Sequence, residues 1–206
     1  MDEDIIFTLD LFGTGVFAAT GAIKGIRKHL DIFGVTVLAC CVGVGGGMIR
    51  DIILGAVPVA ALQHWCYLAI CIGMAFAIFF SVRYWMKFRN IIQISDALGL
   101  GVFTAIGAAK GMSFEISMVG VLLCGVFTAI GGGIIRDVLS GEIPAVLRSD
   151  FYATASLLGG LLYYILHKCT VPWFINFLLT AAFVTAVRLC AMQLHLTLPE
   201  VHSSRD

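Results

Sequence analysis

The sequence predicts an all-α integral membrane protein, and three observations lead to that fold class. Of the 206 residues, only 13% are charged and 60% are apolar even before the 23 glycines are counted, whereas soluble domains carry about 25% charged residues. The apolar residues form seven runs of the length that a spanning helix needs, about 20 residues. Three of these runs recur as an internal repeat. A soluble fold of this size leaves roughly 30% of its unfolded surface exposed, so it could not hide this composition.

The seven runs predict seven transmembrane helices in order along the chain. We expect them near residues 5–24, 32–56, 61–84, 92–111, 115–139, 149–167 and 172–194. Polar or basic links separate the runs, and Trp65 and Trp85 lie at the ends of the third, as interfacial aromatics do. We expect a single membrane domain over 1–206. It comprises repeat 1 (about 5–86), repeat 2 (about 91–168), a seventh helix (about 172–194) and a short cytoplasmic tail (195–206).

The distribution of basic residues predicts the orientation. Lys24, Arg27 and Lys28 lie in the first link, and Arg148 lies on the same side, whereas the opposite side carries Lys110 and Lys168. Cytoplasmic loops carry an excess of Lys and Arg. We therefore expect the N-terminus outside and the C-terminus in the cytoplasm.

The internal repeat predicts two inverted halves. Residues 10–58 align with 96–144 at a constant offset of 86, with 20 identities in 49 positions. Each copy contains three spans, and because three is odd, the second copy crosses the membrane in the opposite direction to the first. Inverted-repeat membrane proteins tend to build their sites near the midplane, from interrupted helices.

A glycine triplet lies near the middle of the second and fifth spans, at Gly45–Gly47 and Gly131–Gly133. Each glycine in a helix interior costs about 1 kcal/mol relative to alanine. We therefore expect helices 2 and 5 to be broken at the triplets, which would free backbone carbonyls to coordinate a cation. The alternative is close helix packing, since small residues let two backbones approach.

An Arg-Asp pair follows each triplet, where a central charge costs about 2.5–3.5 kcal/mol and normally faces water or a partner. We expect each arginine to pair with the aspartate early in its own repeat, which leaves the aspartate beside it to attract cations; the alternative is a purely structural ion pair. The candidate ion pathway comprises Gly45, Gly46, Gly47, Arg50, Asp51, Gly131, Gly132, Gly133, Arg136 and Asp137, supported by Asp10, Asp96, Lys24 and Lys110.

The sequence contains two copies of GGGxxRD on inverted three-helix repeats, and a glycine-rich span that ends in Lys-Gly precedes each copy. A seventh helix follows the second repeat. This pattern resembles the prokaryotic trimeric intracellular cation (TRIC) channel family. Its sequences are also labelled glycine-transporter-domain (UPF0126-like) membrane proteins. The resemblance covers about residues 5–195. It implies a homotrimer in which each protomer has its own pathway for monovalent cations, especially potassium, lined by the kinked second and fifth spans.

The sequence leaves two transport functions open. A passive, potassium-permeable channel would use carbonyls and surplus aspartates to replace the hydration shell of the ion. A secondary transporter of a small zwitterion such as glycine would use the same helix ends and aspartates. We expect no enzyme, because no nucleophile lies beside a base, and no cofactor. Thirteen basic residues balance thirteen acidic ones, so no nucleic acid partner is expected. A prokaryotic plasma (inner) membrane, with lipids as partners, is the expected location.

Overall fold

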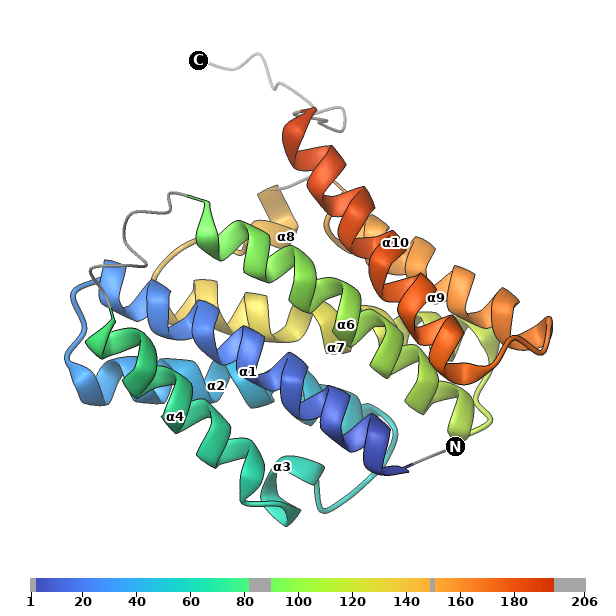
Figure 1. Ribbon diagram of the computed structural model, residues 1–206, viewed down its shortest axis with the longest axis horizontal. Helices are drawn as coiled ribbons and strands as arrows, with labels where there is room; N and C mark the ends of the chain where they lie inside the picture. The colour runs from blue at the N-terminus through green and yellow to red at the C-terminus, as the bar shows by residue number, and fades with distance from the viewer. Residues whose placement is uncertain (1–2, 82–89, 149–150, 195–206) are drawn as a thin grey trace, which may run out of the picture.

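The computed structural model describes residues 3–81, 90–148 and 151–194, and all the secondary structure in these ranges is helical. The predicted tail and the C-terminal end of the predicted third span lie outside them. Seven of the described helices have 15 or more residues, and two have four (Figure 1). In chain order they are α1 (Glu3–Arg27), α2 (Ile32–Ile53), α3 (Ala60–Gln63), α4 (Cys66–Phe80), α6 (Ile91–Ser113), α7 (Met118–Leu139), α8 (Ala145–Arg148), α9 (Ala153–Lys168) and α10 (Trp173–Gln193).

Five of these helices, α1, α2, α6, α7 and α10, are long and apolar enough to cross a membrane. α4 is apolar but has 15 described residues, and α9 has 16. The seven crossings therefore stay a prediction for these two helices. The predicted third span also starts differently, because the short α3 precedes α4 as a separate element.

The two repeats share their local turns as well as their helices. Asp31 caps α2 by accepting a hydrogen bond from the Gly34 N–H at 2.7 Å, and Ser117, 86 residues later, caps α7 in the same way through Gly120 at 3.2 Å. Such caps satisfy N–H groups that have no partner inside the helix. The turns after α2 and α7 place glycines in the left-handed region at the same offset, Gly55 at φ 68° and Gly141 at φ 70°. The two copies of the sequence repeat therefore also share their local backbone structure.

The repeats are inverted and pack along their central helices. In Figure 1, α1 and its counterpart α6 run in opposite directions. Within repeat 1, α1 packs on α2 and α4; within repeat 2, α6 packs on α7 and α9, and α10 covers α6 and α9. The halves meet where α2 contacts α7 and α1 contacts α6.

The pseudo-two-fold axis passes between two phenylalanines. Phe17 and Phe103, which are related by the 86-residue offset, stack with ring centroids 5.1 Å apart and planes 9° apart. Gly13 leaves room for the Phe103 ring and Gly99 for the Phe17 ring, again at this offset. A residue can touch its own repeat counterpart only near the symmetry axis, so this stack marks the centre of the molecule.

The predicted breaks at the glycine triplets are wrong, because α2 and α7 continue as α-helix through them. The triplets instead let the two backbones approach. A Cβ at Gly46 would clash with the carbonyl oxygen of Thr128, and one at Gly132 would lie 2.6 Å from the carbonyl oxygen of Val42, the repeat counterpart of Thr128. Within a membrane, an unpaired backbone group costs several kcal/mol, so an unbroken helix costs less than the break that glycine propensity alone suggests. The close-packing alternative is the correct one.

Candidate functional site

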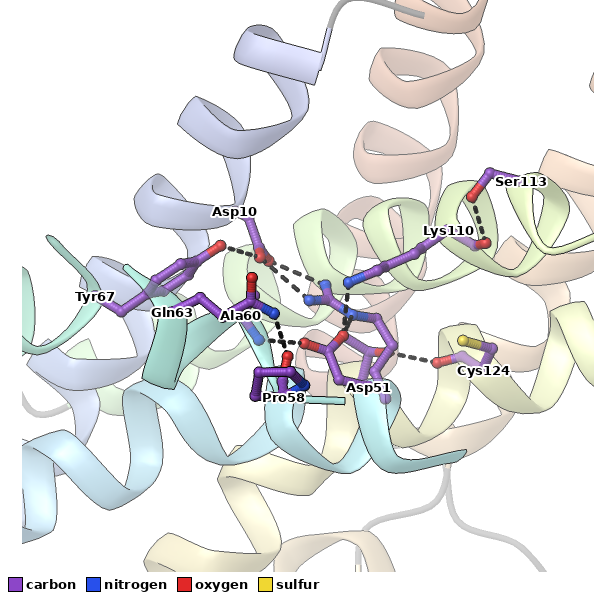
Figure 2. Close-up of polar contacts among 11 residues, drawn as sticks. Asp10, Asp51, Pro58, Ala60, Gln63, Tyr67, Lys110, Ser113 and Cys124 are labelled. Carbon is purple, nitrogen blue, oxygen red and sulfur yellow. Dashed lines mark hydrogen bonds and ion pairs between the residues drawn. The ribbon is translucent and has the colours of Figure 1, made fainter. Parts of the chain in front are cut away.

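The first cluster of buried charges surrounds Arg50 of α2, whose side chain is 2% exposed. Its two terminal nitrogens donate to the two carboxylate oxygens of Asp10 on α1 at 3.1 and 3.3 Å, and its Nε donates to Asp51 at 2.9 Å. The hydroxyl of Tyr67 on α4 donates to Asp10 at 2.7 Å. Figure 2 shows Asp10, Asp51 and Tyr67 converging from α1, α2 and α4. The predicted pairing of Arg50 with Asp10 is confirmed.

Asp51 has more partners than the sequence suggested. Lys110, at the end of α6, donates to its Oδ1 at 2.7 Å, and the backbone N–H of Ala60 donates to its Oδ2 at 2.9 Å (Figure 2). With Arg50, three donors surround this carboxylate. The prediction that Asp51 is left unpaired to attract cations is therefore wrong in this conformation.

The second cluster repeats the first around Arg136 of α7. Its Nη1 donates to Asp96 on α6 at 2.6 Å and its Nε donates to Asp137 at 2.9 Å. The Ala145 N–H, at the start of α8, donates to the other oxygen of Asp137 at 2.9 Å. The predicted pairing with Asp96 is confirmed, whereas Asp137, like Asp51, already has partners.

The third glycine of each triplet faces the ion cluster of its own repeat. A Cβ at Gly47 would lie 3.6 Å from Nη2 of Arg50, and one at Gly133 would lie 3.7 Å from Asp96 and 3.8 Å from Nη2 of Arg136. The first two glycines face the other helix of the α2–α7 crossing. The predicted site residues therefore lie together, with backbone contact at the centre and an ion cluster on each side of it.

Two tyrosines and an arginine belong to these clusters but were not among the predicted residues. Tyr67 binds Asp10, and the buried Tyr152 places its ring 4.8 Å from the guanidinium of Arg188 on α10. Tyr67 and Tyr152 are 85 residues apart, so a self-alignment that allows one deletion after the prolines at 58 and 144 would have paired them. Arg188 lies outside both repeats, and no repeat signal could have found it.

The repeats differ in the partner of their equivalent lysines. Lys110 binds Asp51, but Lys24 binds Glu142 at 2.5 Å, and Lys28 binds the other Glu142 oxygen at 2.9 Å. These two lysines lower the pKa of Glu142 to about 2. The counterpart of Glu142 in repeat 1 is Ala56.

The space beside the two clusters also differs. A cavity of about 610 Å³, here called the Arg136 cavity, is lined by charged residues that include Lys24, Asp96, Arg136, Asp137, Glu142 and Arg188. The space beside the first cluster, here called the Arg50 pocket, is about 10 Å³ and is lined by Asp10, Thr14, Gly47, Arg50, Asp51 and Tyr67, among others. One water needs roughly 10–15 Å³. Within the described ranges, the protein is therefore open beside the Arg136 cluster, and the space lined by Arg50 and Asp51 holds at most about one water.

A family model described as glycine transporter matches the chain twice, over residues 7–83 and 93–168. The two matches start 86 residues apart, as the repeat does. The chain belongs to this family. It is 41% identical to a UPF0126 membrane protein of Vibrio cholerae over 204 residues, which cover 97% of this chain and 84% of that protein. It is 35% identical to the UPF0126 inner membrane protein YadS of Escherichia coli over 197 residues, 95% of each chain.

The fold is that of TRIC channels, whose solved structures align over almost the whole chain. A structure reported under "Structural basis for conductance through TRIC cation channels" has a TM-score of 0.88 and 32% identity, and covers 100% of both chains. The TRIC trimeric intracellular cation channel orthologue from Rhodobacter sphaeroides has a TM-score of 0.87 and 34% identity, and covers 94% of this chain and 100% of that one. These neighbours support a cation channel, and the inner-membrane relatives support a multi-pass membrane protein.

Proposed function

We propose that this protein is a passive, potassium-permeable channel for monovalent cations, with one pathway in each protomer of a homotrimer. The carrying observation is the pair of buried Arg-Asp clusters, one on each side of the α2–α7 crossing, with the Arg136 cavity giving water access to one of them. The fold that holds these clusters is shared with cation channels along the whole chain. A chain with so few charges keeps four aspartates and three arginines buried in these clusters, which suits an ion route better than a structural core.

The proposed route starts in the Arg136 cavity and ends in the Arg50 pocket. Lys and Arg predominate in the links at the cavity end, which would place that cavity at the cytoplasm by the charge bias of membrane proteins. An ion would meet the carboxylates of Asp96 and Asp137 first and those of Asp51 and Asp10 last. Because α2 and α7 are unbroken, the carbonyls of Gly45–Gly47 and Gly131–Gly133 would bind potassium only in a conformation that opens the crossing.

The Arg50 pocket would be the closed gate of this conformation. The ammonium group of Lys110 lies 2.7 Å from Asp51 and so occupies the position that a permeating cation would take. The side chain of Lys110 is 26% exposed while that of Asp51 is 2% exposed, so the lysine reaches inward from the edge of the protein. A conducting state requires this contact to separate.

Assembly and location complete the proposal. We propose a single membrane domain over residues 1–206, in a bacterial inner membrane, with the N-terminus outside and the C-terminus in the cytoplasm. Large apolar side chains such as Phe33, Phe80 and Phe174 are exposed in the single chain. Apolar surface of this kind is covered by neighbouring protomers or by lipid in a membrane assembly.

The proposal is tested by potassium efflux from liposomes that contain the purified protein. Potassium-loaded vesicles that contain the wild-type protein should lose potassium faster than potassium-loaded vesicles without protein. Vesicles that contain the Lys110→Met variant should lose it faster still. Lys168→Met, on the same predicted side but outside the clusters, is the matched control and should behave as the wild type. The proposal would be contradicted if vesicles with the wild-type protein and vesicles with Lys110→Met both lost potassium no faster than protein-free vesicles.

The alternative, a secondary transporter of a zwitterion such as glycine, has the family description in its favour. The Arg136 cavity is also lined by acidic groups that could bind an ammonium group and by basic groups that could bind a carboxylate. Counterflow of labelled glycine into glycine-loaded vesicles distinguishes the two functions. A transporter gives saturable uptake, whereas a cation channel gives none.

A further inference from the structure

Each repeat has a lysine near the end of its first helix, and the inverted symmetry allows the partners of these two lysines to be compared. Lys24, in the last turn of α1, and Lys110, in the last turn of α6, are 86 residues apart. Lys110 binds Asp51 of the opposite repeat at 2.7 Å. By the same symmetry Lys24 would bind Asp137, and both residues line the Arg136 cavity. Lys24 instead binds Glu142. One of the two equivalent contacts is therefore formed and the other is not.

The backbone around Glu142 does not explain this difference. Glu142 donates its N–H to the carbonyl of Asp137 at 2.9 Å, and Ala56 donates its N–H to the carbonyl of Asp51 at 2.8 Å, in the same turn of the other repeat. The turn is thus conserved between the halves, and position 142 carries a carboxylate where position 56 carries a methyl group. The added carboxylate is what offers Lys24 a second partner.

The Glu142 contact is well placed to hold Lys24. Its oxygens bind Lys24 at 2.5 Å and Lys28 at 2.9 Å. The repeat counterpart of Lys28 is Phe114, so the second lysine also belongs to one side only. The side chain of Lys24 is 15% exposed and that of Glu142 is 42% exposed, so water shields the lysine end of this ion pair less than the carboxylate end. The Arg136 cavity, which Lys24 lines, measures about 610 Å³, and the Arg50 pocket, which the Lys110 partner Asp51 lines, measures about 10 Å³.

We propose that Glu142 is a positioning residue that holds Lys24 away from Asp137 and so keeps the Arg136 cavity open. Without this carboxylate, Lys24 takes the place on Asp137 that Lys110 takes on Asp51, and both ends close. The proposal rests on the proposed channel function for its effect on ion flow, but the position of Lys24 is a property of the fold alone. The difference between the two ends of the route is thus traced to Glu142, which holds Lys24 and has alanine as its repeat counterpart.

Potassium efflux from liposomes provides the functional test. Glu142→Gln should lower the efflux rate by about tenfold, within the 5–150-fold range typical of coupled sites, and the double variant Lys24→Met/Glu142→Gln should restore it. Lys168→Met, which lies outside both ion clusters and the Glu142 contact, is the control and should keep the wild-type rate. The reciprocal variant Ala56→Glu should draw Lys110 from Asp51 and raise the rate. Equal rates in wild type, Glu142→Gln and Ala56→Glu would overturn the proposal.

A second readout does not depend on conduction. Gln93 is exposed and lines the Arg136 cavity, so a cysteine at this position, with the exposed Cys169 and Cys190 replaced by serine, reports access of a charged thiol reagent. Its modification should slow about tenfold on Glu142→Gln and recover when Lys24→Met is added. An unchanged modification rate would overturn the proposal even if the protein conducts. Slowed modification in a protein that carries no potassium would retain the Glu142 role and reject the channel.

Discussion

The replacement Gly132→Ala tests whether the glycine triplets serve close packing of α2 on α7. The added Cβ would lie 2.6 Å from the carbonyl oxygen of Val42 and 3.7 Å from the Phe17 ring. The first contact is a clash with the fixed backbone of α2, whereas the second is an ordinary van der Waals distance. The two helices would have to move apart. Overpacking of this kind costs about 1–3 kcal/mol, and alanine returns up to about 1 kcal/mol of helix propensity. The net expected loss is on the order of 1–2 kcal/mol.

The measurement is thermal unfolding of the purified protein in detergent, followed by tryptophan fluorescence. For a chain of this length, 1 kcal/mol corresponds to roughly 2–4 °C, so Gly132→Ala should lower Tm by about 2–8 °C. Gly47→Ala is the matched control, because its Cβ would meet only Arg50 Nη2 at 3.6 Å; its Tm should stay the same or rise. A Tm for Gly132→Ala equal to that of Gly47→Ala would refute the packing role.

Three further predictions concern the charged groups. Asp10→Asn should destabilise the protein by about 3–5 kcal/mol, because it leaves the buried Arg50 with one of its two aspartate partners. Adding Arg50→Met to this variant should restore most of the loss in Tm. An unaltered Tm in Asp10→Asn alone would contradict the pairing. Asp51→Asn and Asp137→Asn should each lower the cation-over-anion permeability ratio measured from reversal potentials in KCl gradients, whereas unchanged ratios in both would assign selectivity to other carboxylates. The pKa of Glu142, lowered to about 2 by Lys24 and Lys28, gives a pH dependence: the contribution of Glu142 is present above its ordinary pKa of 4.5 and is lost as pH falls toward 2. The Tm difference between wild type and Glu142→Gln should therefore stay constant from pH 8 to about 5 and shrink below, and a difference that disappears between pH 8 and 6 would be inconsistent with this pair.

The parts of the fold that the sequence predicted correctly depend on strong, local constraints. A membrane leaves few partners for a buried charge, so Arg50 and Asp10 could be paired from their depth in adjacent spans alone. The inverted halves followed from a repeat with an odd number of spans. These inferences needed no knowledge of how the two halves pack.

The parts that failed depend on contacts between the halves. Lys110 reaches Asp51 from the other repeat, and the Ala60 N–H reaches it from the start of a four-residue helix, so neither contact has a sequence pattern. The triplets were misread because propensity describes an isolated helix, whereas Gly46 and Gly132 lie at a crossing where a side chain does not fit.

Planar-bilayer recording of the purified protein in a potassium gradient tests the central claim most directly. A cation channel predicts discrete single-channel currents that reverse near the potassium equilibrium potential, with longer open periods in Lys110→Met because the contact with Asp51 is lost. The absence of such currents in both proteins, together with saturable glycine counterflow in vesicles made from the same preparation, would contradict the channel and establish the transporter.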